Sequence, residues 1–267
     1  LQLEDFISVI TRTRDELDLR NQSSVENFFN SVKPEVVILA AAKVGGIKAN
    51  MQNRSGFLKE NIEIQTNVMH NAYVNGCKTF VFLGSSCIYP KEAHQPIKEE
   101  YLLSGKLETT NEGYALAKII GLKMAYYYSI EYGMKTLSLM PCNLYGTNDS
   151  FDLENSHVLS ALIRKFVDAK EKGEKEVILW GSGIARREFM HVDDFAEALF
   201  FLLSNYDLPE FINVGTGTDI SIKELANIIA KKTGYEGEIV WDKSIPDGTL
   251  LKRMDVSRLF SYGYRPK

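Results

Sequence analysis

Residues 78–90 read KTFVFLGSSCIYP, and this stretch decides the fold. Its first part, Lys78–Ser85, is a nearly continuous apolar run, which is typical of a parallel strand buried on both faces. Directly after the run come Ser86 and Cys87. Because ligands of open α/β sheets bind beyond the carboxyl ends of the strands, residues 78–90 predict both a strand and one wall of a binding site.

The same apolar run occurs on either side of this stretch. It recurs as EVVILAAA (Glu35–Ala42) and as TLSLM (Thr136–Met140). Segments of helical period lie between the runs: a helix opened by the capping-box pair Ser23 and Glu26, then Asn61–Tyr73, and Tyr114–Tyr132, which ends at Gly133. Strands joined by helical crossovers predict an α/β fold, a Rossmann-like doubly wound parallel sheet with helices on both faces.

The second half of the chain has a looser pattern. We expect a helix over His157–Ala169, a strand over Val177–Trp180, a helix from Asp193, a strand over Phe211–Val214, a helix over Ser221–Thr233 with the capping box Ser221 and Glu224, and a strand over Ile239–Trp241. We interpret residues 1–150 as a dinucleotide-binding Rossmann-like domain. Residues 151–267 are then mainly a smaller α/β substrate lobe, with segments that return to the sheet.

A dinucleotide-binding fold opens with a strand and a glycine-rich turn over the pyrophosphate. Here Leu1–Asp5 reads as the end of the helix after that turn, and Ile7–Ile10 reads as the end of the second strand. We therefore expect the first strand and the glycine-rich turn to be missing from these residues.

Composition excludes several classes of function. The 267 residues are 45% hydrophobic and 25% charged, with a formal net charge of −4 and no basic cluster, which argues against a nucleic-acid partner. No apolar run reaches the roughly 18 residues that a membrane span needs, and the first residues lack the pattern of a signal peptide. Cys77, Cys87 and Cys142 suit neither a disulfide framework nor a zinc site, so we expect a cytoplasmic protein without a metal.

Tyr114 and Lys118 lie four residues apart on a predicted helix, so their side chains face the same way. A free phenol has a pKa of about 10, and an ammonium group one turn away favours the phenolate. Such pairs also arise by chance on helix surfaces. Ser85, at the end of a central strand, adds the third member, and the trio resembles the catalytic set of the short-chain dehydrogenase/reductase superfamily.

A narrower resemblance lies in motifs that follow one another along the chain. These are AAAKVGGI (40–47), GSSCIYP (84–90), PCNLYG (141–146), NSHV (155–158), WGSG (180–183), REFMHVDD (187–194), INVGTG (212–217) and PDGT (246–249). From about Arg12 onward the chain resembles the GDP-L-fucose synthase family, the 3,5-epimerase-4-reductases of GDP-4-keto-6-deoxymannose. Dehydratase relatives carry an acidic residue after the strand serine or threonine, whereas Ser86 and Cys87 follow Ser85 here.

The resemblance implies roles for Cys87 and His157. A C4 ketone makes the protons on C3 and C5 acidic, and inversion needs a base on one face of the sugar and an acid on the other. A thiolate can serve as such a base. The resemblance makes Cys87 the base and His157 the acid, with His157 also near the nicotinamide. The plainer alternatives are a small buried residue at a strand end and a histidine at a helix start.

The resemblance also implies NADP(H) as the cofactor. Tyr114 would protonate the alkoxide formed at C4, Ser85 would orient the ketone, and Lys118 would bond the nicotinamide ribose. Two strand ends would flank the cofactor: Leu83, Gly84, Ser85 and Ser86, and Pro141, Cys142, Asn143 and Leu144. Cys142 stands where the family has threonine, a change that leaves backbone contacts intact.

Arg12 and Arg14 follow the predicted second strand, where the adenine ribose is recognised. An acidic residue there binds the 2'-hydroxyl of NAD, whereas an arginine favours the 2'-phosphate of NADP. Arg14 is the better candidate, and Asp18 and Leu19 would border the adenine. The alternative is that both arginines are merely solvated.

The substrate residues implied by the resemblance come from the second half. Trp180 would stack on guanine, Arg187 would pair with the diphosphate as a bidentate donor, and Asp247 would close on the nucleotide or the sugar. Lys165 stands where the family more often has arginine, and the two side chains are not equivalent for a forked phosphate contact.

Two other functions stay open. One is a related NADPH-dependent 4-keto-sugar reductase acting on another GDP-sugar, such as a modified heptose. The other is a non-catalytic nucleotide-binding protein of the same fold. Relatives pair into dimers through helices that correspond to residues 57–73 and 118–132, so the resemblance also implies a homodimer.

Overall fold

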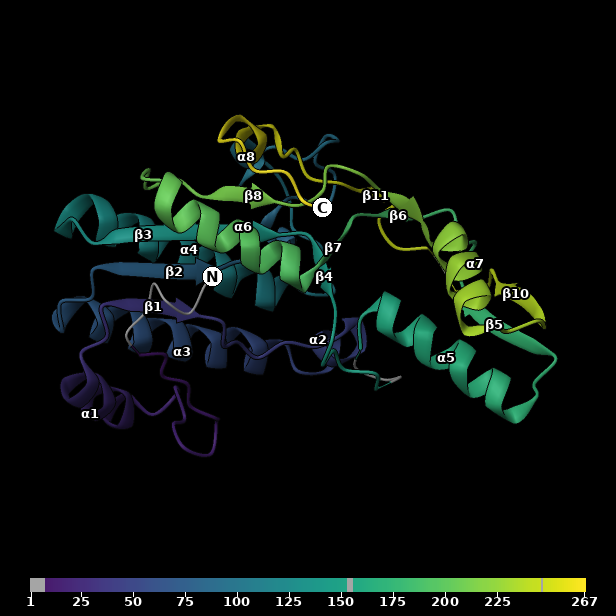
Figure 1. The fold of residues 1–267 in the computed structure, drawn as a ribbon, viewed down its shortest axis with the longest axis horizontal. Coiled ribbons are helices and arrows are strands. Elements are labelled where there is room, and N and C mark those ends of the chain that lie inside the picture. Colours follow the sequence, from purple (N-terminus) through teal and green to yellow (C-terminus); the bar gives the residue numbers. More distant parts are fainter. Residues whose placement is uncertain (1–7, 153–155, 246) are drawn as a thin grey trace.

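The computed structural model describes residues 8–152, 156–245 and 247–267. Its central feature is a four-stranded sheet in the order β1–β2–β3–β8, in which every pair of neighbours is parallel (Figure 1). The strands are β1 (Val36–Leu39), β2 (Thr79–Leu83), β3 (Lys135–Pro141) and β8 (Ile212–Val214). The predicted parallel α/β sheet is confirmed.

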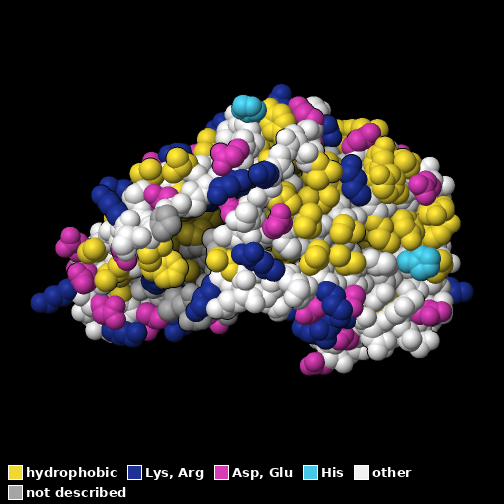
Figure 2. Space-filling view, turned by 180° about the vertical axis from the view of Figure 1, so that it is seen from behind, with side chains coloured by type: hydrophobic (Ala, Val, Ile, Leu, Met, Phe, Trp, Pro, Cys, Tyr) yellow, Lys and Arg dark blue, Asp and Glu magenta, His cyan; other side chains and the backbone are white. Residues whose placement is uncertain are grey.

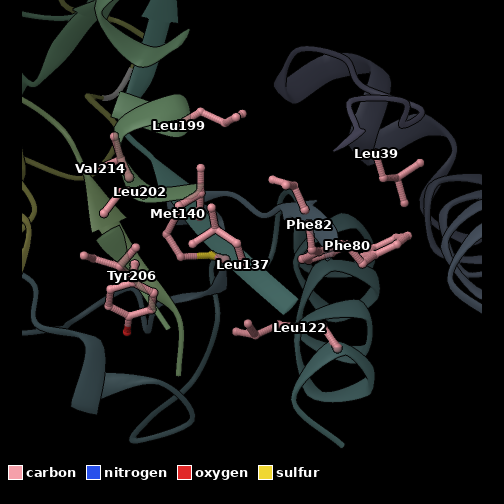
Figure 3. Close-up of a cluster of buried hydrophobic side chains, with 14 of the residues drawn as sticks. Leu39, Phe80, Phe82, Leu122, Leu137, Met140, Leu199, Leu202, Tyr206 and Val214 are labelled. Atoms are coloured by element: carbon pink, nitrogen blue, oxygen red, sulfur yellow. The ribbon is translucent and has the colours of Figure 1, made fainter. Parts of the chain in front are cut away.

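Helices cover both faces of this sheet. The long helices α3 (Arg54–Val74) and α4 (Glu112–Tyr132) pack against each other on one face, and α6 (Val192–Asn205) covers the other (Figure 1). Leu199 and Leu202 of α6 lie beside Met140 and Val214 of the sheet, whereas Leu122 approaches from α4 (Figure 3). The short helices α1 (Gln22–Val32) and α8 (Ser257–Ser261) pack on α3 and β8. Among the described helices, none is long and apolar enough to cross a membrane.

A second, smaller core lies at the other end of the molecule (Figure 1). Here β5 (Glu176–Trp180) pairs in parallel with β10 (Glu238–Asp242), and α5 (Val158–Lys172) and α7 (Ile222–Thr233) pack together beside them. Along β5, Val177 and Leu179 are buried whereas Ile178 and Trp180 are exposed. This small sheet is therefore covered on one face only.

Short elements connect the two cores. The three-stranded sheet β11–β6–β9 consists of β6 (Arg186–Arg187), β9 (Ile220–Ser221) and β11 (Leu251–Lys252), and β4 (Asn143–Tyr145) pairs with β7 (Phe189–His191). The remaining elements are helix α2 (Ile47–Gln52) and the 3-10 turns η2 (Ser86–Ile88) and η3 (Glu99–Tyr101).

Two buried polar side chains fix the C-terminal segment to the main sheet. Asn213 donates to the carbonyl oxygens of Ile97 and Asp255. Glu188 accepts from the backbone N–H groups of Gly217 and Met254. Because buried polar groups are costly unless they are hydrogen-bonded, these contacts hold the end of β11 beside β6.

Three expectations about local structure are wrong. Residues 8–10 form no strand, because no described segment pairs with them. The remaining part of this expectation, Leu1–Asp5 and Ile7, lies outside the described residues. Strand β1 is not buried on both faces: Leu39 is buried, whereas Ile38, whose side chain points to the opposite face, is 39% exposed.

The third correction concerns the first helix. Asn21, rather than Ser23, is the N-cap of α1, because the Asn21 side chain accepts from the backbone N–H of Ser24. The capping box of Ser221 and Glu224 at α7 is confirmed, as is the end of α4 at Gly133.

Candidate active site

The end of β2 forms one wall of the site. Ser85 is the N-cap of η2, and its Oγ accepts from the backbone N–H of Cys87 at 3.3 Å. This tight turn brings the Cys87 side chain back toward the strand end. Cys87 is partly exposed, whereas the other two cysteines are buried.

Helix α4 supplies the facing wall. Lys118 is only 5% exposed, and its Nζ donates to the carbonyl oxygen of Leu83 at 2.8 Å. The same Nζ lies 5.2 Å from the ring centre of Phe82 and 5.7 Å from that of Tyr114. The buried ammonium group thus connects α4 directly to the end of β2.

The pKa values at this site differ from the sequence-based expectation. Burial raises the pKa of Tyr114 well above its usual range, the negative charge of Cys87 raises it further, and a hydrogen bond with Ser85 opposes both effects. Burial also lowers the pKa of Lys118 to about 8. The expected lowering of the Tyr114 pKa is therefore not found, because burial raises that pKa. Tyr114 remains a protonated phenol at neutral pH, the form that can donate a proton.

Two neighbours of the site were missed from the sequence. Asn111 donates from Nδ2 to the Sγ of Cys87 at 3.2 Å. The ring of Phe57 contacts Tyr114 edge to face, with the ring centres 6.5 Å apart. Asn111 could have been found, because positions 111, 114 and 118 have the i, i+3, i+7 spacing of one helix face.

His157 is not brought to Cys87. It is the N-cap of α5 and is exposed. Within residues 8–152, 156–245 and 247–267, no hydrogen bond or ring contact joins it to the residues around Ser85. Asn155 of the same motif lies outside the described residues. The role of His157 as the acid stays a prediction.

The two strand ends expected to flank the cofactor lie at the same edge of the sheet. Leu83–Ser86 begin at the last residue of β2 and Pro141–Leu144 begin at the last residue of β3, and these strands are parallel neighbours. The backbone N–H of Cys142 donates to Val214, and the side chain of Asn143 donates to the carbonyl oxygen of Glu188. The Cys142 side chain is buried, and burial raises the pKa of its thiol. It therefore packs as a neutral group.

The four residues expected at the adenine end differ from one another in their exposure and contacts. Arg12 and Arg14 are both exposed, and the Arg12 guanidinium lies 5.4 Å from the ring centre of Phe28. Asp18 is bound by Arg20, which lowers the pKa of the Asp18 carboxyl to about 2. Leu19 packs against the main core. The structure leaves the two arginines as the exposed cations of this loop.

This donor set suits a phosphorylated dinucleotide. Lys118 has three N–H donors and uses one on Leu83, so two remain for ribose hydroxyls. Arg12 and Arg14 offer guanidinium groups, which match the geometry of a phosphate.

The substrate-side residues form two groups in the second half. Lys165 donates to the carbonyl oxygen of Ile178 at 3.2 Å, and its Nζ lies 5.3 Å from the ring centre of Trp180. Burial lowers the pKa of Lys165. Trp180 is 67% exposed, so its ring offers a free face for stacking.

The second group surrounds Arg187. Its Nη1 donates to the carbonyl oxygen of Thr249 at 2.6 Å, and burial lowers its pKa while the charge of Asp247 raises it. Asp247 accepts from the hydroxyl and the backbone N–H of Ser182. Lys252 is the direct partner of Arg187 in the β11–β6 register. Sequence reasoning missed Lys252, because a strand of two residues leaves no pattern.

A serine at a strand end, facing a tyrosine and a lysine four residues apart on the next long helix, defines a site of the short-chain dehydrogenase/reductase type. Residues 3–215 match the model of the NAD dependent epimerase/dehydratase family. The chain belongs to this family.

Individual relatives agree with this assignment. GDP-L-fucose synthase 1 of Arabidopsis thaliana is 52% identical over 267 residues, covering 100% of this chain and 83% of the relative. GDP-L-fucose synthase of Escherichia coli (strain K12) is 46% identical, covering 99% and 85%.

Solved structures are also similar. A GDP-mannoheptose C4 reductase from Campylobacter jejuni with NADP bound has a TM-score of 0.91 and 40% identity, covering 100% of this chain and 87% of that one. A GDP-L-fucose synthetase from Naegleria fowleri bound to NADP has a TM-score of 0.89 and 28% identity, covering 96% and 80%.

The buried ammonium group of Lys118 makes stability depend on pH. Its pKa is about 8 in the folded chain and 10.5 ordinarily, so the unfolded state binds more protons between these values. The free energy of unfolding therefore rises with pH across this window. Relative to Lys118→Met, the unmodified chain should gain about 2 kcal/mol between pH 7 and pH 9.5.

Urea unfolding of both proteins at the two pH values measures this gain. Lys172→Met, at an exposed position of α5, is the matched control. A constant difference between the unmodified chain and Lys118→Met would contradict the burial of a charged Lys118.

Proposed function

We propose that this chain is an NADPH-dependent enzyme that inverts C3 and C5 of GDP-4-keto-6-deoxy-D-mannose and reduces C4, which yields GDP-L-fucose. One observation carries the proposal: a partly exposed thiol, Cys87, lies in the same cluster as the reductase trio of Ser85, Tyr114 and Lys118. A reductase alone needs no such thiol. Because Cys87 has to stay reduced to act as a base, the cytoplasm is the suitable compartment.

Epimerisation uses the acidity that the C4 ketone gives to its neighbouring carbons. The thiolate of Cys87 removes the proton from C3 or C5, and the electron pair of the broken C–H bond forms an enolate whose charge is on the C4 oxygen. Hydrogen bonds from Ser85 and Tyr114 stabilise that oxygen. An acid on the opposite face, assigned to His157, returns a proton to the carbon with inversion.

Reduction follows at the same carbonyl group. Bound NADPH supplies the hydride. Tyr114 gives its phenolic proton to the C4 oxygen, and Ser85 keeps that oxygen in place. Lys118 binds the ribose and, with its pKa lowered to about 8, can transfer a proton toward Tyr114 near neutral pH.

The second half of the chain holds the nucleotide. The exposed ring of Trp180 stacks on guanine, and the side-by-side Arg187 and Lys252 bind the diphosphate. Asp247 closes on the sugar or nucleotide, and Lys165 adds a further cation beside Trp180.

Two variants should separate the two reactions. Cys87→Ala should lower solvent deuterium incorporation at C3 and C5 at least about 100-fold, the usual contribution of a general base. Tyr114→Phe should lower NADPH oxidation by a similar factor and lower incorporation much less, because Ser85 still donates to the C4 oxygen. Proton NMR of the sugar and absorbance at the NADPH band measure the two rates.

Cys77→Ala, a buried cysteine in the main core, is the matched control and should keep both activities. Incorporation by Cys87→Ala at the unmodified rate would sink the assignment of Cys87 as the base.

A second function has one observation in its favour. His157 is exposed, and no contact in the described part of the chain joins it to Cys87. A GDP-sugar 4-keto-reductase without epimerase activity needs no such acid. If the unmodified chain oxidises NADPH with a 4-keto GDP-sugar but incorporates no deuterium, this second function is correct.

A further prediction concerns Arg14, the residue proposed to bind the 2'-phosphate of NADPH. Arg14→Ala should weaken NADPH binding at least about tenfold, because it removes a charge-assisted contact to the 2'-phosphate. Binding of NADH, which lacks that phosphate, should not change. Isothermal titration calorimetry measures both, with Arg164→Ala on α5 as control. Equal weakening for NADH and NADPH would show that Arg14 does not recognise the 2'-phosphate.

We infer that the chain forms a homodimer through α3 and α4. Apolar side chains gather on the half of the molecule that holds these helices when it is seen from behind (Figure 2). The large exposed members on the two helices are Val74, Leu116, Ile120, Tyr127, Ile130 and Tyr132. A contiguous apolar patch of this kind is typical of an interface between subunits.

Ile130→Glu tests the dimer. The unmodified chain should have twice its mass of 30.2 kDa in light scattering after gel filtration, and the variant should be monomeric, because a charge would be buried at the interface. Ile228→Glu, at a similarly exposed isoleucine of α7, should remain dimeric. A monomeric unmodified chain would refute the dimer.

A further inference from the structure

Asn111 is the N-cap of α4, and it does not behave as an N-cap. Asparagine is favoured at this position because its side-chain oxygen accepts from the first free N–H groups of the helix. Asn21 and Asn53 do this at α1 and α3, where they accept from Ser24 and Gly56. Asn111 makes no capping hydrogen bond. Its amide donates to the Sγ of Cys87 instead.

The other end of the Asn111 side chain adds a second observation. Its Oδ1 is buried and has no hydrogen-bond partner among the described residues. An acceptor left in this state is destabilising. Asn111 therefore forms neither a capping hydrogen bond nor, within the described residues, a hydrogen bond to its side-chain carbonyl oxygen. It does form the contact with the sulfur of Cys87. Local stability of the helix does not explain this orientation of the Asn111 side chain.

We propose that Asn111 is the positioning residue for Cys87. Its N–H group holds the sulfur at the site and stabilises negative charge on it, and the positive end of the α4 helix dipole acts in the same direction. This inference rests on the proposed role of Cys87 as the base. Asn111 itself does not exchange protons with the sugar.

The position of Asn111 at the start of α4 places its side chain beside the sulfur of Cys87. Lys118 is fixed to Leu83 seven residues later on the same helix face, and Ser85 holds the backbone of Cys87 from the strand side. The sulfur is thus held between the end of β2 and the start of α4. A small displacement of either element would break the N–H···S contact.

Two substitutions test whether Asn111 acts as a hydrogen-bond donor to Cys87 or only fills space beside it. Asn111→Ala removes the amide and opens the site. Asn111→Asp keeps the shape and is itself a favourable N-cap, but it replaces the donor by a negative charge. Asn21→Ala, which removes a true cap far from the site, is the matched control.

The first measurement is the rate at which iodoacetamide modifies Cys87 in the substrate-free protein, followed by peptide mass spectrometry. The rate should fall about tenfold or more in Asn111→Ala, the size expected for one hydrogen bond to a charged group. It should fall further in Asn111→Asp, and Asn21→Ala should not change it. Asn21→Ala should lower Tm more than Asn111→Ala does.

The second measurement is deuterium incorporation at C3 and C5, which should fall in parallel while NADPH binding is unchanged. Rates of modification within about twofold of the unmodified chain in both Asn111 variants would overturn the proposal, as would an Asn111→Asp that matches the unmodified chain. Because modification needs no sugar, it decides the role of Asn111 even if the unmodified chain incorporates no deuterium and the epimerase proposal itself fails.

Discussion

The hydrogen bond from Lys118 to the carbonyl oxygen of Leu83 is the contact on which the site depends. Desolvation of an ammonium group is unfavourable, and here it lowers the pKa of Lys118 to about 8. In return, the contact fixes α4 against the end of β2. Asn111 and Tyr114 lie on the same face of α4, so the position of Lys118 also sets theirs. Ser85 and Cys87 follow Leu83 at the end of β2, on the other side of this hydrogen bond.

The electrostatics of the cluster fit the order of the two proposed reactions. Burial raises the pKa of Tyr114 and the charge of Cys87 raises it further, so the phenol keeps its proton while Cys87 acts as the base in the proposed inversion. That proton is needed afterwards, when the C4 oxygen becomes an alkoxide. One cluster can therefore serve inversion and reduction, because Tyr114 keeps the proton that reduction needs.

Much of the fold was predictable because buried parallel strands and capped helices leave clear patterns. The apolar runs around Phe80 and Leu137 became central strands, and Ser221 with Glu224 opened α7 as expected. The exposure of Ile38 was not predictable, since it depends on which elements cover that face of the sheet. An apolar pattern can be read from a short stretch of sequence, whereas the packing over a sheet face depends on the whole fold.

The site shows the same division. Ser85, Tyr114 and Lys118 could be named from spacing, and the structure brings them together. The direction of the pKa of Tyr114 was wrong, because spacing does not report desolvation. Asn111 was missed because an asparagine before a helix reads as a cap, although its spacing from Tyr114 and Lys118 places it on their helix face; the contact with sulfur shows its different role. Cys87 and His157 were paired by resemblance, and the pair stays a prediction.

In the proposed function, one cluster, completed by His157, acts on both faces of a 4-keto sugar. A crystal structure with NADP and a GDP-hexose bound tests it most directly. We expect the C4 oxygen within hydrogen-bond distance of Ser85 and Tyr114, with Cys87 and His157 on opposite faces of the ring and each about 3–4 Å from C3 or C5. A bound sugar that Cys87 does not contact, with His157 still exposed to solvent, would contradict it.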